Sequence, residues 1–514
     1  MSVRLRSLPA WIGSAATWLV VYATVCTTGQ RFDTRYLDYG WQLVPWDVLS
    51  QDPWRSLWYL HVQPPLWNAT LGISAWLSPV SDAATLQIVM AVFGLIVAIA
   101  SAELAQRLGA RKRTATIVGV VASLHPEVLK GAFEPTYELA VAALLVVLAA
   151  VVAGRDHGSQ AVRRQVLMVS ALVTVIAMTR SLYHPLWAAA VLATVLWVHR
   201  RRIDRRLVIG AILIPVITIG AWMGKNEILY GRATLSSWFG MNLQRAVIPV
   251  LDLDELQEMY ERGEVSDVAM IGPFGKYSLY APVVESCEPE HRHRSVLEPM
   301  RKTDPWSPNF NYECFLPVFD QAGRDAWAVI KEHPGVWLEG RMWSLRTTMA
   351  VAITPEESPS IVMRGLDRVY SVLRIDYSGV LSTSGWGTPI FGQLEAPVDF
   401  GLMLLPVYGL VLVTGAFQAR RLFRRGDPSS DVASPDRDPT RDQVDRRALT
   451  FFVIGSTVAF TILVGAVAEL GEQARFRTMT DPLAMVGAAA LVESYLRARR
   501  GQSAVGAQAD AVGR

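Results

Sequence analysis

Six long stretches without a charged side chain constrain the fold of this chain more than any other feature. A helix that crosses the hydrocarbon core of a membrane needs roughly 17–25 mainly apolar residues, because its backbone must satisfy all of its own hydrogen bonds there. The six stretches are Ser7–Gln30, Ala83–Ala102, Ser181–Val198, Leu207–Gly224, Phe400–Ala419 and Ala448–Ala468. Four weaker candidates, with polar interruptions or charged borders, are Thr114–Lys130, Tyr137–Gly154, Gln165–Thr179 and Pro482–Val492. The sequence therefore predicts a polytopic α-helical membrane protein with about ten transmembrane helices.

The composition agrees with this prediction and excludes other classes of protein. Charged residues make up 18% of the chain, below the roughly 25% of an ordinary soluble protein. The 49 basic and 46 acidic residues leave a net charge of +3, which is too balanced for a protein that neutralises nucleic-acid phosphates. The three cysteines show no zinc-type spacing. We therefore expect no nucleic-acid partner and no structural metal.

The distribution of Lys and Arg predicts the orientation in the membrane. If ten helices span, every cluster of basic residues falls on one side, which the positive-inside rule identifies as cytoplasmic. Both termini are then cytoplasmic, in the cell membrane. Counting Leu66–Pro79 as a span would break this agreement, so we interpret it as an interfacial helix. The clusters are Arg4 and Arg6, Arg111–Arg113, Arg163 and Arg164, Arg200–Arg206, Arg420–Arg425 with Arg446 and Arg447, and Arg497–Arg500.

The predicted topology divides the chain into four parts and leaves one question about cysteine open. Cys287 and Cys314 both fall in the large outer segment, where oxidation is possible, so a disulfide and two buried thiols are both compatible with the sequence. The parts are an N-terminal transmembrane module (1–224) with a first outer loop (31–82), a mainly α-helical extracytoplasmic loop domain with amphipathic helices (225–397), C-terminal transmembrane helices with a cytoplasmic loop at 420–447 (398–496), and a disordered tail (497–514).

Four groups of ionisable residues fall on the predicted outer side. Such groups inside or beside membrane spans are costly and are usually retained for function. Taken singly, each could also be a helix cap or an interfacial anchor. We expect them to converge on one cavity mouth. The groups are Asp33, Asp38, Asp47, Asp52, His61 and Gln63; His125, Glu127, Lys130, Glu134 and Glu138; Arg180 and His184; and Glu469, Glu472, Arg475 and Arg477.

The order of these motifs resembles that of the bacterial GT-C glycosyltransferases, and among them the group related to the dolichyl-phosphate-mannose protein mannosyltransferases. These are polytopic enzymes that use polyprenyl-phosphate sugars. The resemblance rests on an acidic first outer loop with Asp33, on His61-Val62-Gln63-Pro64-Pro65-Leu66, and on a late Glu472-Gln473-Ala474-Arg475-Phe476-Arg477. It covers the N-terminal two-fifths of the chain best and the last two predicted helices next.

The resemblance and the chemistry together suggest which residues act. Transfer from a lipid-linked sugar needs a base for the acceptor hydroxyl and a cationic group for the leaving phosphate. The resemblance implies a catalytic acid in the first outer loop, about thirty residues before the Pro-Pro-Leu element, and Asp33 lies 30 residues before Gln63. We expect Asp33 as general base, with Asp38 as second choice. The resemblance also implies a second acid in the next outer loop, for which Glu138 and Glu134 are the candidates.

Arginine is the expected ligand of the leaving phosphate, because a guanidinium matches phosphate geometry and stays charged in a partly dry site. Arg475 is the first candidate, oriented by Glu472. The residues expected to assist at the phosphate are Arg180, His184 and Arg477. The residues expected to contact the substrates elsewhere are His61, Gln63, Glu134 and Glu472.

These expectations describe an inverting glycosyltransferase that moves a sugar from a polyprenyl-phosphate donor to a hydroxyl acceptor by in-line displacement on the outer side. Its partners are that donor, membrane lipid and an acceptor that is a glycan, a protein or an exported natural product. A divalent cation is compatible, although the carboxylates show no recognisable ligand spacing. Two alternatives from other classes are a transporter or flippase for a lipid-linked sugar or anionic solute, and an acyltransferase or polysaccharide polymerase.

Overall fold

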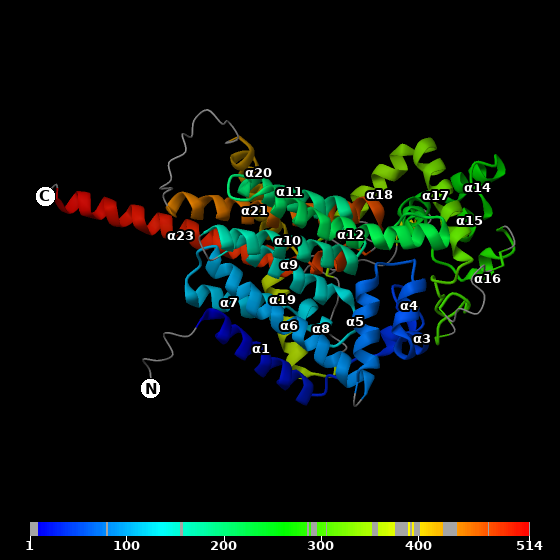
Figure 1. Ribbon diagram of the computed structural model, residues 1–514, viewed down its shortest axis with the longest axis horizontal. Coiled ribbons are helices and arrows are strands. Elements are labelled where there is room, and N and C mark those ends of the chain that lie inside the picture. The colour runs from blue at the N-terminus through cyan, green and yellow to red at the C-terminus, as the bar shows by residue number, and fades with distance from the viewer. Residues whose placement is uncertain are drawn as a thin grey trace.

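The protein is an elongated bundle of helices (Figure 1). The computed structural model describes residues 9–78, 81–154, 158–284, 287–288, 296–304, 306–351, 358–375, 389–390, 393–394, 401–424, 439–470 and 472–512. Its elements are α1 (Ala10–Thr27), α2 (Arg35–Tyr39), α3 (Trp46–Gln51), α4 (Pro53–Tyr59), α5 (Pro65–Trp76), α6 (Asp82–Arg107), α7 (Lys112–Leu124), α8 (Pro126–Gly131), α9 (Tyr137–Ala153), α10 (Ser159–Thr179), α11 (Pro185–His199), α12 (Arg205–Tyr230), α13 (Phe239–Val247), η1 (Ile248–Val250), α14 (Leu253–Glu261), α15 (Asp267–Ile271), α16 (Tyr277–Tyr280), α17 (Phe315–Glu332), α18 (Pro334–Thr347), α19 (Ile361–Arg374), β1 (Pro389–Ile390), β2 (Gln393–Leu394), α20 (Leu404–Arg424), α21 (Pro439–Ala468), α22 (Gln473–Thr478) and α23 (Asp481–Val512). The strands β1 and β2 pair antiparallel, with Pro389 opposite Leu394.

Five helices in the described part of the chain are long and apolar enough to cross a membrane, judged by length and composition: α1, α6, α10, α12 and the Gln443–Ala468 part of α21. The helix α12 argues for lipid most directly, because only 17% of its most apolar 18-residue window is buried inside the protein. An apolar surface of that extent is unfavourable in water and is solvated well by hydrocarbon. The chain is therefore a helical membrane protein, as its sequence predicts.

The remaining predicted spans take several forms. The helices α9 and α11 are apolar but shorter. The predicted single span Thr114–Lys130 is two helices, α7 and α8, because Pro126 lacks a backbone donor and its ring clashes with the preceding turn. The helices α20 and α23 cover the predicted spans near the C-terminus, and of the loop expected at 420–447, residues 425–438 lie outside the described residues.

The C-terminal tail differs from its prediction as a disordered segment. The helix α23 continues through the expected tail as far as Val512. Ala, Gln and Arg are frequent in this stretch, and all three favour a helical backbone.

The two ends of the bundle carry different groups. In Figure 1, α1 begins and α23 ends at the left, whereas α14, α15 and α16 lie at the right. Three of the predicted basic clusters meet around Glu493 and its neighbour Ser494. The Nε of Arg111 and the Nη2 of Arg497 lie 3.8 and 3.1 Å from Glu493 Oε1, and Arg447 donates to Ser494. These clusters therefore share one end, away from the predicted outer segments.

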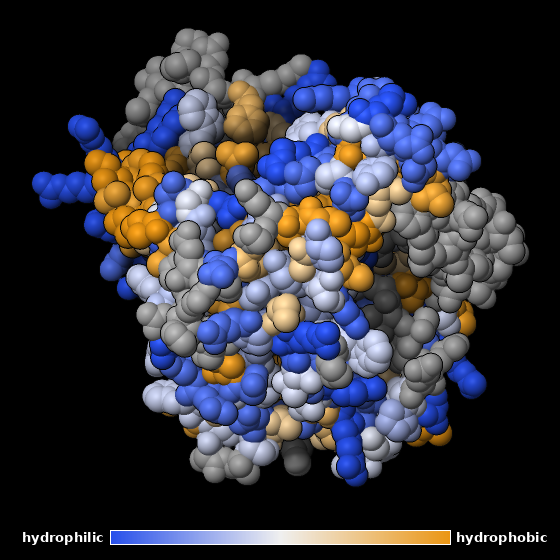
Figure 2. All heavy atoms as spheres, turned by 90° about the vertical axis from the view of Figure 1, so that its right-hand side faces the viewer, coloured by the Kyte–Doolittle hydropathy of each residue, from blue (hydrophilic) through white to orange (hydrophobic). Residues whose placement is uncertain are grey.

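The first outer loop and the segment after α12 share one hydrophobic core, although the sequence analysis placed a boundary at residue 224. Leu49 and Leu60 from the first loop pack in the same cluster as Trp238 and Phe315. The Cys287–Cys314 disulfide closes within this region, so the first of the two alternatives for these cysteines is confirmed. Figure 2 looks onto this end of the molecule, where hydrophilic side chains surround separate apolar patches. We refer to this joint unit as the outer domain.

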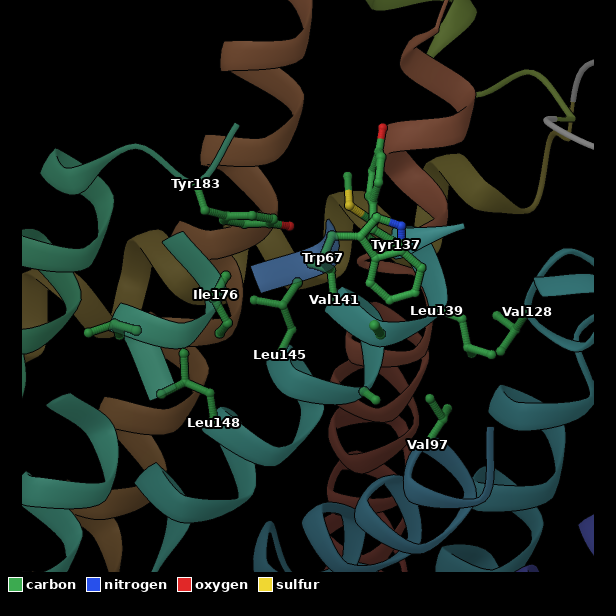
Figure 3. Packing of buried hydrophobic residues seen from close by; sticks show 14 of the residues in the cluster. Trp67, Val97, Val128, Tyr137, Leu139, Val141, Leu145, Leu148, Ile176 and Tyr183 are labelled. Atoms are coloured by element: carbon green, nitrogen blue, oxygen red, sulfur yellow. The ribbon is translucent and has the colours of Figure 1, made fainter. Parts of the chain in front are cut away.

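The helix α9 places the first residues of the candidate site. It is apolar around its whole circumference and is buried along most of its length, as expected for a helix inside a bundle. Figure 3 shows Leu139 directed toward Val128 on one side, and Leu145 and Leu148 directed toward Ile176 on the other. This packing fixes the first turn of α9, which carries Tyr137 and Glu138.

Candidate active site

A small, partly open cavity lies where α8, α9 and α22 meet. Its volume is about 80 Å³, and its polar lining includes Glu127, Glu134, Glu138, Arg475 and Thr478. Glu134 and Glu138 precede and open α9, whereas Arg475 belongs to α22 near the other end of the chain. The structure thus brings together two acids and an arginine that the sequence analysis expected to converge.

Arg475 is held between three segments of the chain. Its Nε lies 2.5 Å from Glu138 Oε1 and its Nη1 lies 3.5 Å from Glu472 Oε2. Its Nη2 donates to Tyr36 Oη at 3.5 Å. The Arg475–Glu138 contact is close but not aligned as a hydrogen bond, and both buried oxygens of Glu138 lack a hydrogen-bond donor. The Glu138 carboxylate can therefore accept a hydrogen bond from a ligand while Arg475 balances its charge.

Arg180 lies over the same aromatic ring as Arg475. The guanidinium carbons of Arg180 and Arg475 are 4.3 and 5.3 Å from the centre of the Tyr137 ring. Arg180 is 6% exposed, and among the described residues it forms no ion pair. Its Nε and the Nε2 of buried Gln63 have no hydrogen-bond partner, while Ser181 donates to Gln63 Oε1 at 3.4 Å. Each unmet buried donor costs about 1–3 kcal/mol, so this place suits an anion.

A further arginine supports the site from the outer domain. The Nη1 of Arg245 in α13 lies 3.4 Å from Glu469 and 3.5 Å from Glu472. Burial raises the pKa of Glu469. At Glu472, burial acts in the same direction, but Arg475 and Arg245 outweigh it and lower the pKa. Glu472 therefore keeps its charge between two guanidiniums, which orients both of them.

Asp33 lies beside the segment that carries Glu134, although it is not among the residues that line the cavity. Its backbone N–H donates to the carbonyl of Phe133 at 2.8 Å, one residue before Glu134. Its carboxylate accepts hydrogen bonds from Arg35 Nε at 3.0 Å and Nη2 at 2.6 Å. The Arg35 hydrogen bond lowers the pKa of Asp33, whereas burial raises the pKa of Glu134. Two neighbouring acids with pKa values displaced in opposite directions are typical of acid–base sites.

His61 has a structural environment, which argues against its expected contact with the donor. It is buried, with Nδ1 2.7 Å from Ser237 Oγ and Nε2 3.1 Å from the Asn311 carbonyl oxygen. Burial lowers the pKa of His61 to about 3, so the ring is neutral. Both ring nitrogens are used by the protein, and the residue ties the first outer loop to the rest of the outer domain.

Two further expected residues lie away from the arginine cluster or have other partners. His184 is exposed and caps α11, where its Nδ1 accepts from the Leu186 N–H at 3.3 Å. Asp38 lies on α2 and interacts electrostatically with Lys302 of the outer domain. Burial lowers the pKa of Lys302 to about 7, and Asp38 opposes this effect. These positions argue against the expected roles of His184 at the phosphate and of Asp38 as a base.

Arg477 belongs to a buried ion-pair network. Its Nη1 lies 2.6 Å from Asp481 Oδ2 and its Nη2 lies 3.0 Å from Glu127 Oε2. Arg374 pairs with the other Glu127 oxygen at 3.1 Å. His125, Glu127 and Asp481 present their ligand atoms within 4.8 Å of one another. The arginines already neutralise these carboxylates, which favours a structural network over a metal site and argues against a phosphate-binding role for Arg477.

Three side chains of the site are absent from the sequence-based expectations. Tyr137 supplies the ring under both arginines, Tyr36 accepts from Arg475, and Arg245 approaches from the outer domain. Tyr36 and Tyr137 are sequence neighbours of the expected acids, so proximity to those motifs could have suggested them. Arg245 lies in an amphipathic helix without a recognisable motif, and only the tertiary structure reveals its position.

Arg475 and Arg477 both lie on α22. They allow a test of the assignment of Arg475 to the candidate site and of Arg477 to a structural ion-pair network. Arg477→Ala leaves Glu127 and Asp481 buried without their partner, which typically costs about 3–5 kcal/mol. The Arg475 side chain is 27% exposed, whereas Arg477 is fully buried. We therefore expect Arg477→Ala to lower the thermal unfolding temperature of the purified protein by several degrees more than Arg475→Ala. Equal losses in the two variants would contradict this assignment.

Comparisons with known proteins find no match by sequence and distant likenesses to solved structures. No protein-family model and no curated protein sequence matches the chain. Among solved structures, the archaeal oligosaccharyltransferase AglB from Archaeoglobus fulgidus, in complex with an inhibitory peptide and a dolichol-phosphate, matches with TM-score 0.38 and 10% identity, over 96% of this chain and 52% of that one. ArnT from Cupriavidus metallidurans, bound to undecaprenyl phosphate, matches with TM-score 0.34 and 12% identity, over 93% and 77%. The chain thus spans about half the length of AglB. At these TM-scores the likeness does not assign an activity.

Proposed function

We propose that the protein is an inverting glycosyltransferase that moves a sugar from a polyprenyl-phosphate donor to a hydroxyl acceptor. In this proposal ten helices span the membrane, both termini are cytoplasmic and the cavity beside α9 faces the extracytoplasmic side. The meeting of three basic clusters at the opposite end of the bundle supports this orientation. The acceptor is a glycan, a protein or an exported natural product.

The pair of guanidiniums over Tyr137 carries the proposal. Arg180 interacts at longer range with the carboxylates of Glu469 and Glu472 but forms no direct ion pair, and a buried guanidinium that is only partly compensated favours a ligand of opposite charge. Arg180 and Arg475 lie on the same ring from separate helix ends, and Arg180 has no ion-pair partner in the described chain. Guanidiniums bind phosphate through parallel N–H bonds. In the proposed reaction they hold the phosphate that leaves C1, and Gln63 Nε2 donates a further hydrogen bond.

The neighbouring acids supply the base. Asp33 takes the proton of the acceptor hydroxyl, and the resulting oxygen attacks C1 from the side opposite the phosphate. The bond between C1 and the phosphate oxygen breaks, its electron pair passes to the phosphate held by Arg475 and Arg180, and the configuration at C1 inverts. Glu134 and Glu138 line the cavity, and in this proposal they hold sugar hydroxyls.

The Asp33→Asn variant tests the reaction. A positioned general base contributes about 10²–10⁴-fold to a rate, so we expect sugar transfer from a polyprenyl-phosphate donor to fall by that factor at unchanged protein abundance. Asp38→Asn in the same loop is the matched control and should transfer at nearly the normal rate. A transporter of lipid-linked sugars would have no transfer activity for the substitution to reduce. A fully active Asp33→Asn enzyme would show that another residue is the base.

Arg35 allows a second test, through pH. Because its hydrogen bond lowers the pKa of Asp33, Asp33 stays ionised below the usual carboxylate pKa of about 3.9. The acid limb of the pH profile of kcat/KM should therefore move to higher pH in Arg35→Ala, where that stabilisation is lost. Arg55→Ala, another exposed arginine of the first outer loop, should leave the limb in place. An unmoved limb in Arg35→Ala would count against Asp33 as the titrating base.

A further inference from the structure

We propose that the outer domain binds a neutral carbohydrate chain in a groove along α13 and α17, and that this chain is the acceptor; the second part rests on the proposed function. The groove has a volume of about 970 Å³, within the range of about 300–1,000 Å³ common for ligand sites. Its floor is close-packed, because a Cβ on Gly240 would collide with the Phe319 carbonyl oxygen. Residues that line it include Arg232, Phe239, Glu264, Asp320, Trp327 and Glu332.

Two aromatic rings in the groove are open to solvent. Trp327 is 53% exposed and Phe239 is 56% exposed, and both lie outside the candidate membrane spans. Large aromatic side chains that stay exposed beside polar groups are typical of binding surfaces. The C–H face of a sugar ring covers an aromatic ring, while the sugar hydroxyls remain available to polar neighbours. The combination therefore favours a carbohydrate over a simple ion.

The charges in the groove balance one another. Three basic and three acidic side chains line it. Arg232 pairs with Asp320, and Arg262 beside the groove lies 2.8 Å from Glu264 and 3.6 Å from Glu332. Arg324 and Lys331 form no ion pair among the described residues, but the equal number of basic and acidic groups in the lining keeps the net field small. These groups still offer N–H donors and carboxylate oxygens to hydroxyl groups. A neutral chain fits this pattern better than a phosphorylated or strongly acidic one.

The groove adjoins the candidate active site. Ser236, which lines the groove, donates to the Val62 carbonyl at 2.6 Å. Val62 precedes Gln63, whose amide Nε2 has no hydrogen-bond partner. The helix α13 runs from Phe239 in the groove to Arg245 in the charge cluster. Six residues of α-helix cover about 9 Å. A chain in the groove can therefore present one of its ends toward the proposed site of transfer.

Direct binding tests the groove independently of catalysis. The full-length protein, purified in detergent, is titrated with maltohexaose, mannohexaose and arabinohexaose, and binding is measured by calorimetry. We expect at least one hexasaccharide to bind, the dissociation constant to rise about tenfold or more in Trp327→Ala, and Trp327→Phe to restore much of the affinity. Trp306→Ala is the control, because Trp306 is 76% exposed in the same outer domain but outside the groove.

Each other outcome of the titration overturns the proposal. These outcomes are no binding of any hexasaccharide, unchanged binding in Trp327→Ala, an equal loss in Trp306→Ala, and Trp327-dependent binding of phosphatidylglycerol vesicles or of an acidic peptide in place of the sugars. The proposed function fails separately. Suppose that hexasaccharide binding depends on Trp327 but neither the wild-type protein nor any variant transfers sugar. The carbohydrate-binding site is then supported, and the assignment of its ligand as the acceptor is contradicted.

Discussion

The pairing of buried charges at one end of the bundle determines the geometry of the candidate site. Arg477 joins Glu127 of α8 to Asp481 at the start of α23, and all three side chains are fully buried. Breaking such a pair leaves an uncompensated charge in a poorly polarisable interior, so the three helices have little freedom to move apart. Because α22 is fixed in this way, Arg475 two residues earlier meets Glu138 at the start of α9.

A consequence of this arrangement is a cluster of arginines beside acids of different strength. Arg180, Arg245 and Arg475 come from separate helices, and Glu472 lies between the last two. Burial raises the pKa of Glu134, whereas the hydrogen bond from Arg35 lowers the pKa of Asp33. The outer domain packs onto the same end through Arg245, which contacts Glu469 and Glu472. Anion binding, proton transfer and acceptor binding can therefore be located within a few helical turns of one another.

The sequence predicted the membrane class, the five helices of the described chain that are long and apolar enough to span, and the segments that meet at the site, because uncharged runs and outer-face charges are local properties. It could not separate Arg475 from Arg477, since residues two apart on a helix point in different directions and the partners that distinguish them, Glu138 and Glu127, lie hundreds of positions away. His61 is occupied by Asn311, 250 residues later, and Arg245 carries no motif. The break between α7 and α8 could have been predicted from the sequence, because Pro126 marks it.

A structure of the purified protein with a polyprenyl phosphate bound, determined by cryo-electron microscopy, tests the central claim most directly. The account predicts phosphate density within hydrogen-bonding distance of both Arg475 and Arg180, beside the Tyr137 ring. Phosphate density at the Arg111–Arg497 end of the bundle, or density that leaves Arg180 without a ligand, would contradict it.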